Sequence, residues 1–319
     1  LELRNELNNE LKNHKNNNFQ EAKKIYEKIL IKNPKHFETN FYLGTLLAQN
    51  KVFKDSLFYL KKASEINFNL PDLHNNLGLI YRELGELENA LNSISKAIEL
   101  KPDYANAYSN LGLICKELGQ LIKAEKYCKK SIRLNPRLID PYNNLGLIYL
   151  DKQNYIEAKK YLKKALELNP KYSPALLNLG NLEKNFGEIE KAENIFKEII
   201  SINPNYFDAY NNLMDLYERT NQNEKLLEII SHSKNIFKEN LIVKLFYGQY
   251  LYKTKKYDKA INTLKNINFN NQLNRERLRC LVIAKSYNQL DKTTQSFKYF
   301  KITNEINLTT KSKEINKSK

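Results

Sequence analysis

The feature that most constrains this sequence is a nine-residue segment that recurs, with few changes, every 34 residues. It reads LHNNLGLIY at residues 73–81, AYSNLGLIC at 107–115 and PYNNLGLIY at 141–149. A repeat of this length is one supersecondary unit, which needs neighbouring units to bury its apolar side chains. The sequence therefore predicts an array of stacked repeats.

Three series of small residues and prolines keep the same period, which makes the repetition a specific signal. The glycines are Gly44, Gly78, Gly112, Gly146, Gly180 and Gly248, with Met214 in the remaining place. The small residues of the second half are Ala22, Ser56, Ala90, Ala124, Ala158, Ala192 and Ala260. The prolines are Pro34, Pro102, Pro136, Pro170 and Pro204.

The residue pattern within each repeat predicts an antiparallel pair of helices. Apolar residues recur at helical spacing over 73–84 and again over 87–98, and Gly85 separates the two runs. Pro102 should end the second helix, because proline lacks the amide donor and restricts the preceding residue. Gly78 and Ala90 are expected where the two backbones approach most closely. Neighbouring pairs should then stack so that the first helices line a concave surface.

The pattern Leu77-Gly78, Tyr81, Ala90, Ile94, Pro102 resembles the tetratricopeptide repeat family. The resemblance implies an all-α fold, a right-handed α-solenoid of about nine 34-residue helix-turn-helix repeats over residues 1–310. Residues 311–319 are expected to be a basic tail that is disordered or cut. We expect the repeats to start at residues 3, 37, 71, 105, 139, 173, 207, 241 and 277.

Asparagine stands at one position of the first helix in five consecutive repeats. These residues are Asn76, Asn110, Asn144, Asn178 and Asn212. Asparagine is a poor mid-helix residue because its amide competes for backbone hydrogen bonds, so the recurrence asks for a reason. One interpretation is structural, with the amides bonded to a neighbouring turn or to water. The other is a ladder of amides that holds the backbone of an extended peptide, and here the sequence resembles the repeat arm of O-linked N-acetylglucosamine transferases.

Seven residues further along the same helical face, an acidic residue follows in three repeats. Glu83, Glu117 and Asp151 occupy this position beside Arg82, Lys116 and Leu150. The expected groove is therefore of mixed sign, and we include the three carboxylates among the peptide-binding residues. Lysines gather instead on the second helices, where a charged run usually serves solubility.

The net charge of +16 and the pI near 9.4 raise the question of nucleic-acid binding. Only eight of the 52 basic residues are arginine, the residue best suited to bidentate phosphate contact. RNA-binding helical repeats remain an alternative, although the strict 34-residue period argues against them. Arg275, Arg277 and Arg279 form the one cluster in which we would look for phosphate contacts.

The sequence offers no catalytic constellation, and neither a metal nor a cofactor is expected. No carboxylate or thiol recurs near the four histidines at ligand spacing, and no Gly-rich phosphate loop occurs. Cys115, Cys128 and Cys280 are too few and too irregular for a disulfide framework, which favours the cytoplasm. No stretch has the apolar length of a membrane span.

These observations predict a protein–protein interaction scaffold whose groove binds an extended segment of a partner. The alternative is the substrate-recognition arm of a larger transferase, a sulfotransferase or glycosyltransferase whose catalytic domain follows Lys319. The closing repeats, which include YFKITNEIN, weakly resemble the repeat region of bacterial proteins in which tetratricopeptides precede a sulfotransferase domain.

Overall fold

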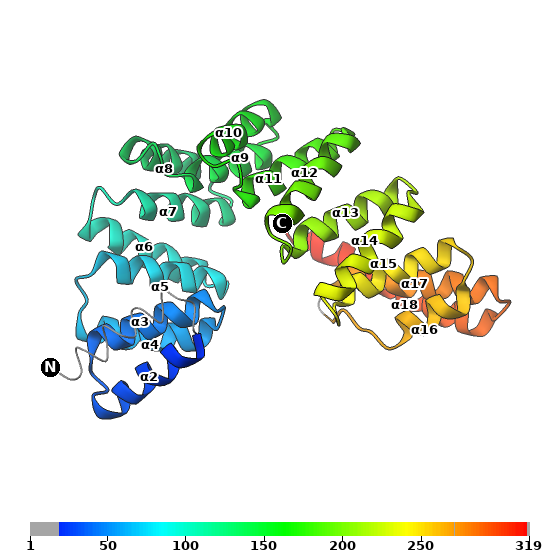
Figure 1. Cartoon of the computed structure of the whole chain (residues 1–319), viewed down its shortest axis with the longest axis horizontal. Coiled ribbons are helices and arrows are strands. Elements are labelled where there is room, and N and C mark those ends of the chain that lie inside the picture. The colour runs from blue at the N-terminus through cyan, green and yellow to red at the C-terminus, as the bar shows by residue number, and fades with distance from the viewer. Residues whose placement is uncertain (1–18, 271, 318–319) are drawn as a thin grey trace. The chain divides into compact units, whose positions relative to one another are not determined.

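The computed structural model describes residues 19–270 and 272–317, and this part of the chain forms 17 α-helices and no strand (Figure 1). The chain divides into two compact units, an N-terminal unit of residues 1–175 and a C-terminal unit of residues 176–319. The fold is an all-α solenoid of helix-turn-helix repeats, as the sequence predicts. The first helix expected for the repeat at residue 3 lies outside the described residues.

The N-terminal unit contains five second helices and four first helices, in alternation. They are α2 (Phe19–Lys32), α3 (Phe37–Gln49), α4 (Phe53–Ile66), α5 (Pro71–Glu83), α6 (Leu87–Leu100), α7 (Ala105–Glu117), α8 (Leu121–Leu134), α9 (Asp140–Asp151) and α10 (Tyr155–Leu168). Each of α5, α7 and α9 packs against the second helix of its own repeat, the second helix of the preceding repeat and a neighbouring first helix.

The boundary between the two units falls within α11 (Ser173–Asn185). The C-terminal unit continues with α12 (Ile189–Ile202), α13 (Phe207–Arg219), α14 (Asn223–Ile236), α15 (Leu241–Lys253), α16 (Tyr257–Lys265), α17 (Leu273–Gln289) and α18 (Thr293–Lys317). Helix α17 begins at Leu273, before the start at 277 that we expect from a two-residue insertion near residues 266–273. Helix α18 also takes in residues 311–317, where we expect an irregular tail; no glycine or proline interrupts that segment.

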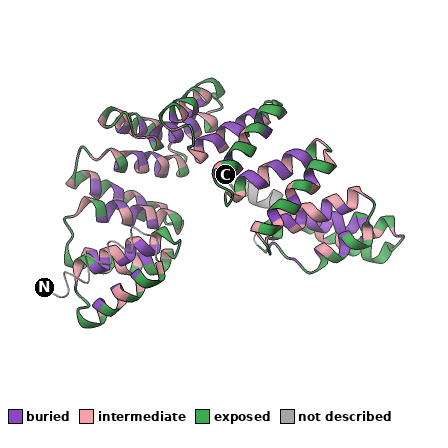
Figure 2. Ribbon diagram, in the orientation of Figure 1, coloured by how far each residue is buried: buried purple, intermediate pink, exposed green. Residues whose placement is uncertain are grey.

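The close helix approach expected at Gly78 is present. A Cβ atom on Gly78 would lie 2.5 Å from the side chain of Ile94 and 3.2 Å from the carbonyl oxygen of Ala90. Ala90 and Ile94 are completely buried. Figure 2 shows the buried residues as purple stripes along the facing sides of the helices. The core is therefore a succession of junctions between helix pairs.

The turn inside each repeat needs a residue with left-handed backbone. Gly119 has φ +74°, and the amides of Gly119 and Gln120 donate to the carbonyls of Lys116 and Cys115 at 2.9 and 2.8 Å. This is the bonding pattern in which glycine closes a helix. Gln153 occupies the equivalent place in the next repeat with φ +57°. A residue with a Cβ atom is strained there.

Replacing Gln153 with glycine should therefore stabilise the protein. We expect the free energy of unfolding to rise by about 0.5 to 1 kcal/mol, because relief of strain exceeds the added freedom of the unfolded chain. Urea denaturation measures the change. Gly119→Ala is the matched control and should shift stability the opposite way, since nothing lies within 4 Å of a Cβ atom there and only the backbone is affected. A loss of stability in Gln153→Gly would contradict the argument.

Candidate interaction surface

In the N-terminal unit, three of the predicted asparagines connect neighbouring first helices. The Nδ2 atom of Asn110 on α7 donates to Oδ1 of Asn75 on α5 at 2.8 Å. Asn144 on α9 donates to the carbonyl oxygen and to Oγ of Ser109 on α7, at 3.3 and 3.2 Å. Asn76 on α5 donates to Oγ1 of Thr45 on α3 at 3.3 Å. Each amide group therefore binds the repeat that precedes it.

In these bonds each asparagine side chain acts only as a donor, through Nδ2. Within the described part of the chain, Oδ1 of Asn76, Asn110 and Asn144 accepts no hydrogen bond; Asn76 and Asn110 are half-buried, and Asn144 is 6% exposed. Because Nδ2 is held, the side chain has a fixed orientation and Oδ1 stays available as an acceptor. The donors thus bind groups within the neighbouring first helix rather than a turn, and no described group binds the acceptors.

Of the two predicted asparagines of the C-terminal unit, Asn212 differs from these three. Asn212 on α13 donates to the carbonyl oxygen of Asp208 on its own helix at 2.9 Å. Its Oδ1 accepts from Nζ of Lys184 at 2.8 Å, and the same lysine pairs with Asp215 at 3.0 Å. Asn178 lies half-buried on α11. Asn212 therefore has both halves of its amide occupied, and it does not offer the acceptor that the sequence interpretation requires.

The predicted acidic residues also bridge neighbouring first helices. Nε of Arg82 on α5 lies 2.8 Å from Oε1 of Glu117 on α7, and Nζ of Lys116 on α7 lies 3.3 Å from Oδ2 of Asp151 on α9. Glu83 pairs with its neighbour Arg82 at 2.9 Å. The carboxylates are therefore neutralised by basic side chains of the same surface. Exposed pairs of this kind contribute about 0 to 1 kcal/mol each.

A row of leucines, which the sequence interpretation missed, lies between the asparagines and the carboxylates. Leu79, Leu113 and Leu147 follow the asparagines by three residues and are only partly buried. Residues three apart on a helix share a face. The leucines could have been found from the repeated LGL segment, whose second leucine falls on the asparagine side of the helix.

We call the nine residues of these three rows on α5, α7 and α9 the asparagine face. They are Asn76, Asn110, Asn144, Leu79, Leu113, Leu147, Glu83, Glu117 and Asp151. The face presents oriented hydrogen-bond acceptors beside exposed apolar carbon, bordered by paired charges. Such a surface suits a partner with backbone N–H donors and apolar side chains.

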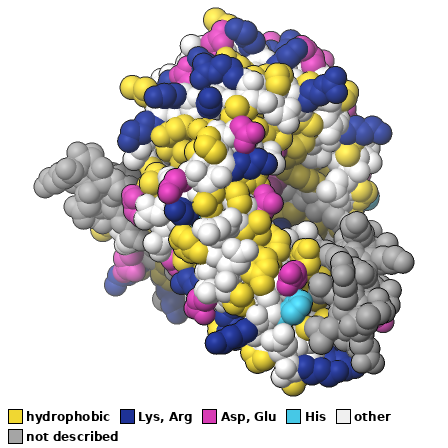
Figure 3. Space-filling view, turned by 90° about the vertical axis from the view of Figure 1, so that its left-hand side faces the viewer, with side chains coloured by type: hydrophobic (Ala, Val, Ile, Leu, Met, Phe, Trp, Pro, Cys, Tyr) yellow, Lys and Arg dark blue, Asp and Glu magenta, His cyan; other side chains and the backbone are white. Residues whose placement is uncertain are grey.

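Of the expected arginine cluster, Arg279 is buried, while Arg275 and Arg277 are partly exposed. Arg279 on α17 is 7% exposed, and its guanidinium donates to the carboxylate of Glu276 and, at 3.0 Å, to the carbonyl oxygen of Leu264. Arg275 donates to Gln272 at 2.7 Å. Figure 3 shows one face of the molecule, on which basic side chains are interspersed with hydrophobic and uncharged ones. The hypothesis of phosphate contact through Arg279 is wrong, because helix packing buries the side chain.

The three cysteines are buried, and burial raises the pKa of the Cys128 thiol to about 12, far from the range of a reactive thiolate. His74 stands at a packing position, with Nε2 2.6 Å from the carbonyl oxygen of Phe68.

Within the described residues, no group of three or more His, Cys, Asp or Glu side chains could hold a metal ion. Across the same residues, every helix is too short or too polar to cross a lipid bilayer.

Comparison with known proteins places repeats of one family over residues 78–217. A profile described as TPR repeat matches residues 78–119, and two profiles described as tetratricopeptide repeat match 103–168 and 149–217. No curated protein matches the sequence significantly. The matched residues include α7, α9 and the intervening α8, and hence much of the asparagine face.

Solved structures agree on the fold. A tetratricopeptide repeat protein from Parabacteroides merdae is 24% identical with a TM-score of 0.53, and the alignment covers 76% of this chain and 98% of that protein. PilF of Pseudomonas aeruginosa is 20% identical with a TM-score of 0.51, over 67% of this chain and 97% of PilF. TTC0263 of Thermus thermophilus, also a TPR protein, is 21% identical with a TM-score of 0.51, over 54% and 94%. Residues 78–217 of this chain therefore carry tetratricopeptide repeats.

Proposed function

We propose that this protein is an interaction scaffold whose asparagine face binds an extended polypeptide segment of a partner protein. Tetratricopeptide repeat proteins generally mediate protein–protein interactions, which supports the general role. The proposal assigns that role to α5, α7 and α9 of the N-terminal unit.

The proposal rests on a difference between the two polar atoms of each asparagine side chain. Nδ2 of Asn76, Asn110 and Asn144 is fixed by the preceding repeat, while Oδ1 accepts nothing from the described residues. Three acceptors of fixed orientation on adjacent helices suit the N–H groups of an extended backbone, which point outward at regular intervals. A peptide bound through its backbone is recognised with little dependence on its sequence.

The leucines beside the asparagines add a modest preference for apolar side chains in the bound segment. The half-buried Leu79, Leu113 and Leu147 would contact apolar side chains of the bound segment. The charges of Glu117 and Asp151 are already balanced by Arg82 and Lys116, so they favour neither a basic nor an acidic partner. Each net hydrogen bond contributes about 0.5 to 1.5 kcal/mol, and ordering the peptide offsets part of this. We therefore expect micromolar affinity.

A peptide array followed by titration tests the proposal. Fifteen-residue peptides that bind the full chain would be measured against Asn110→Ala/Asn144→Ala, which removes two acceptors. Loss of two hydrogen bonds should weaken binding by at least about fivefold. N-methylation of the peptide backbone should weaken binding similarly, because it removes the donors.

The matched control is Asn75→Ala/Ser109→Ala. It removes side-chain acceptors that the two asparagines use between repeats, but it leaves Oδ1 of Asn110 and Asn144 in place. Both double variants should therefore lose similar stability in urea. The first should lose more peptide affinity, because the control keeps both acceptor oxygens and loses only part of what fixes their orientation. Equal losses of affinity would show that the asparagines act through repeat packing alone.

A further inference from the structure

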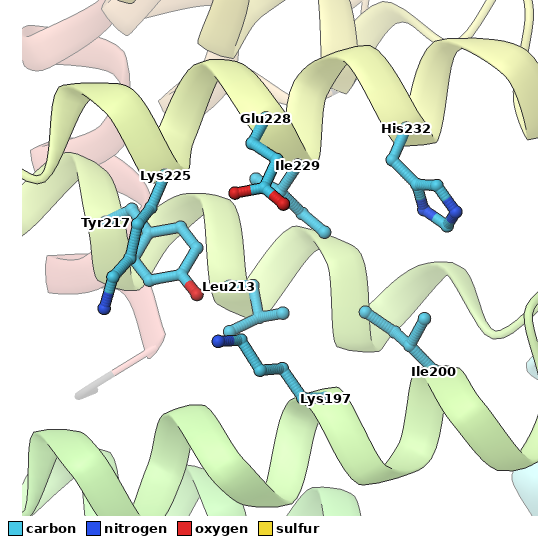
Figure 4. A pocket seen from close by; sticks show the side chains of 8 residues that line it. All are labelled: Lys197, Ile200, Leu213, Tyr217, Lys225, Glu228, Ile229 and His232. Atoms are coloured by element: carbon cyan, nitrogen blue, oxygen red, sulfur yellow. The ribbon is translucent and has the colours of Figure 1, made fainter.

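A cavity of about 380 Å³ opens between α12, α13 and α14 of the C-terminal unit (Figure 4). Ile200 of α12, Leu213 of α13 and Ile229 of α14 give it an apolar wall, and Tyr217 and Lys197 border that wall. Its size is in the range of small-molecule sites, which are apolar with a few placed polar groups.

A buried carboxylate fixes the polar end of the cavity. Glu193 of α12, 8% exposed, accepts a hydrogen bond from the hydroxyl of Tyr217 at 3.0 Å and from Nζ of Lys197 at 2.8 Å. Lys225 of α14 approaches the same carboxylate at 3.0 Å. Burial alone would raise the pKa of Glu193, but these donors outweigh it and the pKa is lowered. The side-chain ends of Tyr217, Lys197 and Lys225 are therefore held in place by Glu193.

The same arrangement occurs two repeats earlier, between α8, α9 and α10 of the N-terminal unit. There Glu125 accepts from the hydroxyl of Tyr149 at 2.8 Å and from Nζ of Lys129 at 2.6 Å. The apolar wall is conserved between the two junctions, because Ile132 and Leu145 stand in the places of Ile200 and Leu213.

The two junctions differ at one apolar lining position, and at three polar ones, where Lys225, Glu228 and His232 replace Glu157, Lys160 and Lys164. Tyr161 of α10 stands where α14 has Ile229. Its ring stacks on that of Tyr149, with the centroids 5.4 Å apart and the planes 6° from parallel. The first junction therefore contains a phenol ring stacked on its tyrosine, and the second contains an isoleucine and a cavity.

We propose that the cavity between α12, α13 and α14 binds a single phenol ring, placed as Tyr161 is placed in the first junction. The ring lies against Tyr217 and the apolar wall of Ile200, Leu213 and Ile229. Stacked aromatic pairs gain more than the area they bury, which distinguishes a phenol from an aliphatic alcohol of equal size. The phenol is either a free small molecule or the tyrosine side chain of a partner.

Methyl NMR of the full chain with labelled isoleucines tests the site directly. Titration with p-cresol should shift the methyl signals of Ile200 and Ile229 and saturate at one equivalent, and cyclohexanol should bind about two- to tenfold more weakly. The peptide acetyl-Ala-Tyr-Ala-amide is the second probe. If it shifts the same signals, a partner's tyrosine is the source, and if only p-cresol does, a free phenol is. Unmoved Ile200 and Ile229 signals with both probes would overturn the proposal.

Two reciprocal variants separate this site from unspecific binding. Ile229→Tyr copies the first junction into the second and should abolish the cresol site. Tyr161→Ile copies the cavity into the first junction and should raise the stoichiometry to two. Circular dichroism checks that both variants keep their helices. Unchanged cresol affinity in folded Ile229→Tyr, or unchanged stoichiometry in folded Tyr161→Ile, would each contradict the assignment.

Discussion

Replacing Arg279 with alanine should lower the free energy of unfolding by about 3 to 5 kcal/mol, because removal of one partner leaves a buried charge uncompensated. The side chains of Arg279 and Glu276 are 9% and 13% exposed. Oε2 of Glu276 also accepts from the backbone amide of Phe269 at 3.1 Å, so the pair holds the connection between α16 and α17. Urea denaturation monitored by circular dichroism measures the loss.

Arg275→Ala is the matched control, because it removes the same charge from the same helix. Its guanidinium bonds only to Gln272 among the described residues, near the start of α17. We expect its effect on stability to stay within about 0.5 kcal/mol, as for most surface substitutions. If both variants lost equal stability, general charge rather than the buried pair would be responsible. A stable Arg279→Ala variant would show that the pair adds nothing to folding.

Gly146→Ala should lower the free energy of unfolding by about 1 to 3 kcal/mol, although alanine is normally the better helix former. A Cβ atom on Gly146 would lie 2.6 Å from Cδ2 and 2.7 Å from Cγ of Leu162. Leu162 is completely buried on α10, so it has little room to move. The two helices would have to separate, which loosens the packing around them. Thermal and urea denaturation should both report the loss.

A double variant shows whether this contact is the cause. Leu162→Ala alone should cost about 2 to 5 kcal/mol, because it leaves a cavity. In Gly146→Ala/Leu162→Ala the new methyl group enters space that the leucine has left. The double variant should therefore be less destabilised than the sum of the single variants, by about 0.5 to 3 kcal/mol. Additive losses would place the effect of Gly146→Ala elsewhere than at Leu162.

The helix pairs were predictable because their signals are local and repeated. Three signals each depend on a few neighbouring residues: the helical spacing of apolar residues, the turn at Gly85 and the close approach at Gly78. The 34-residue period then repeats each signal along the chain. Helix α17 was less predictable, because the segment before it departs from the 34-residue pattern. Its start at Leu273 is decided by local contacts, among them the bond from Phe269 to Glu276.

The candidate site was predictable only in part. The sequence shows that asparagine recurs, but the partner of each amide depends on the preceding repeat, which offers Thr45, Asn75 or Ser109 in turn. Asn212 looks equivalent in the sequence, and only the structure shows that Lys184 occupies its oxygen. The burial of Arg279 escaped prediction for the same reason, because spacing along one helix does not show what packs against it.

The direction of the asparagine bonds limits how repeats of this chain could be shuffled. Asn144 donates to the preceding repeat, so it requires an acceptor there and asks nothing of the repeat that follows. A repeat moved by recombination would therefore pack best behind a neighbour with a serine, threonine or asparagine at the right place, because the backbone carbonyl alone supplies only one of the two acceptors. Its own effect on the next repeat would depend on a different residue. Whether a repeat packs well thus depends on the repeat on its N-terminal side. Duplication of two adjacent repeats as a block keeps an asparagine together with its acceptor, whereas transfer of a single repeat does not.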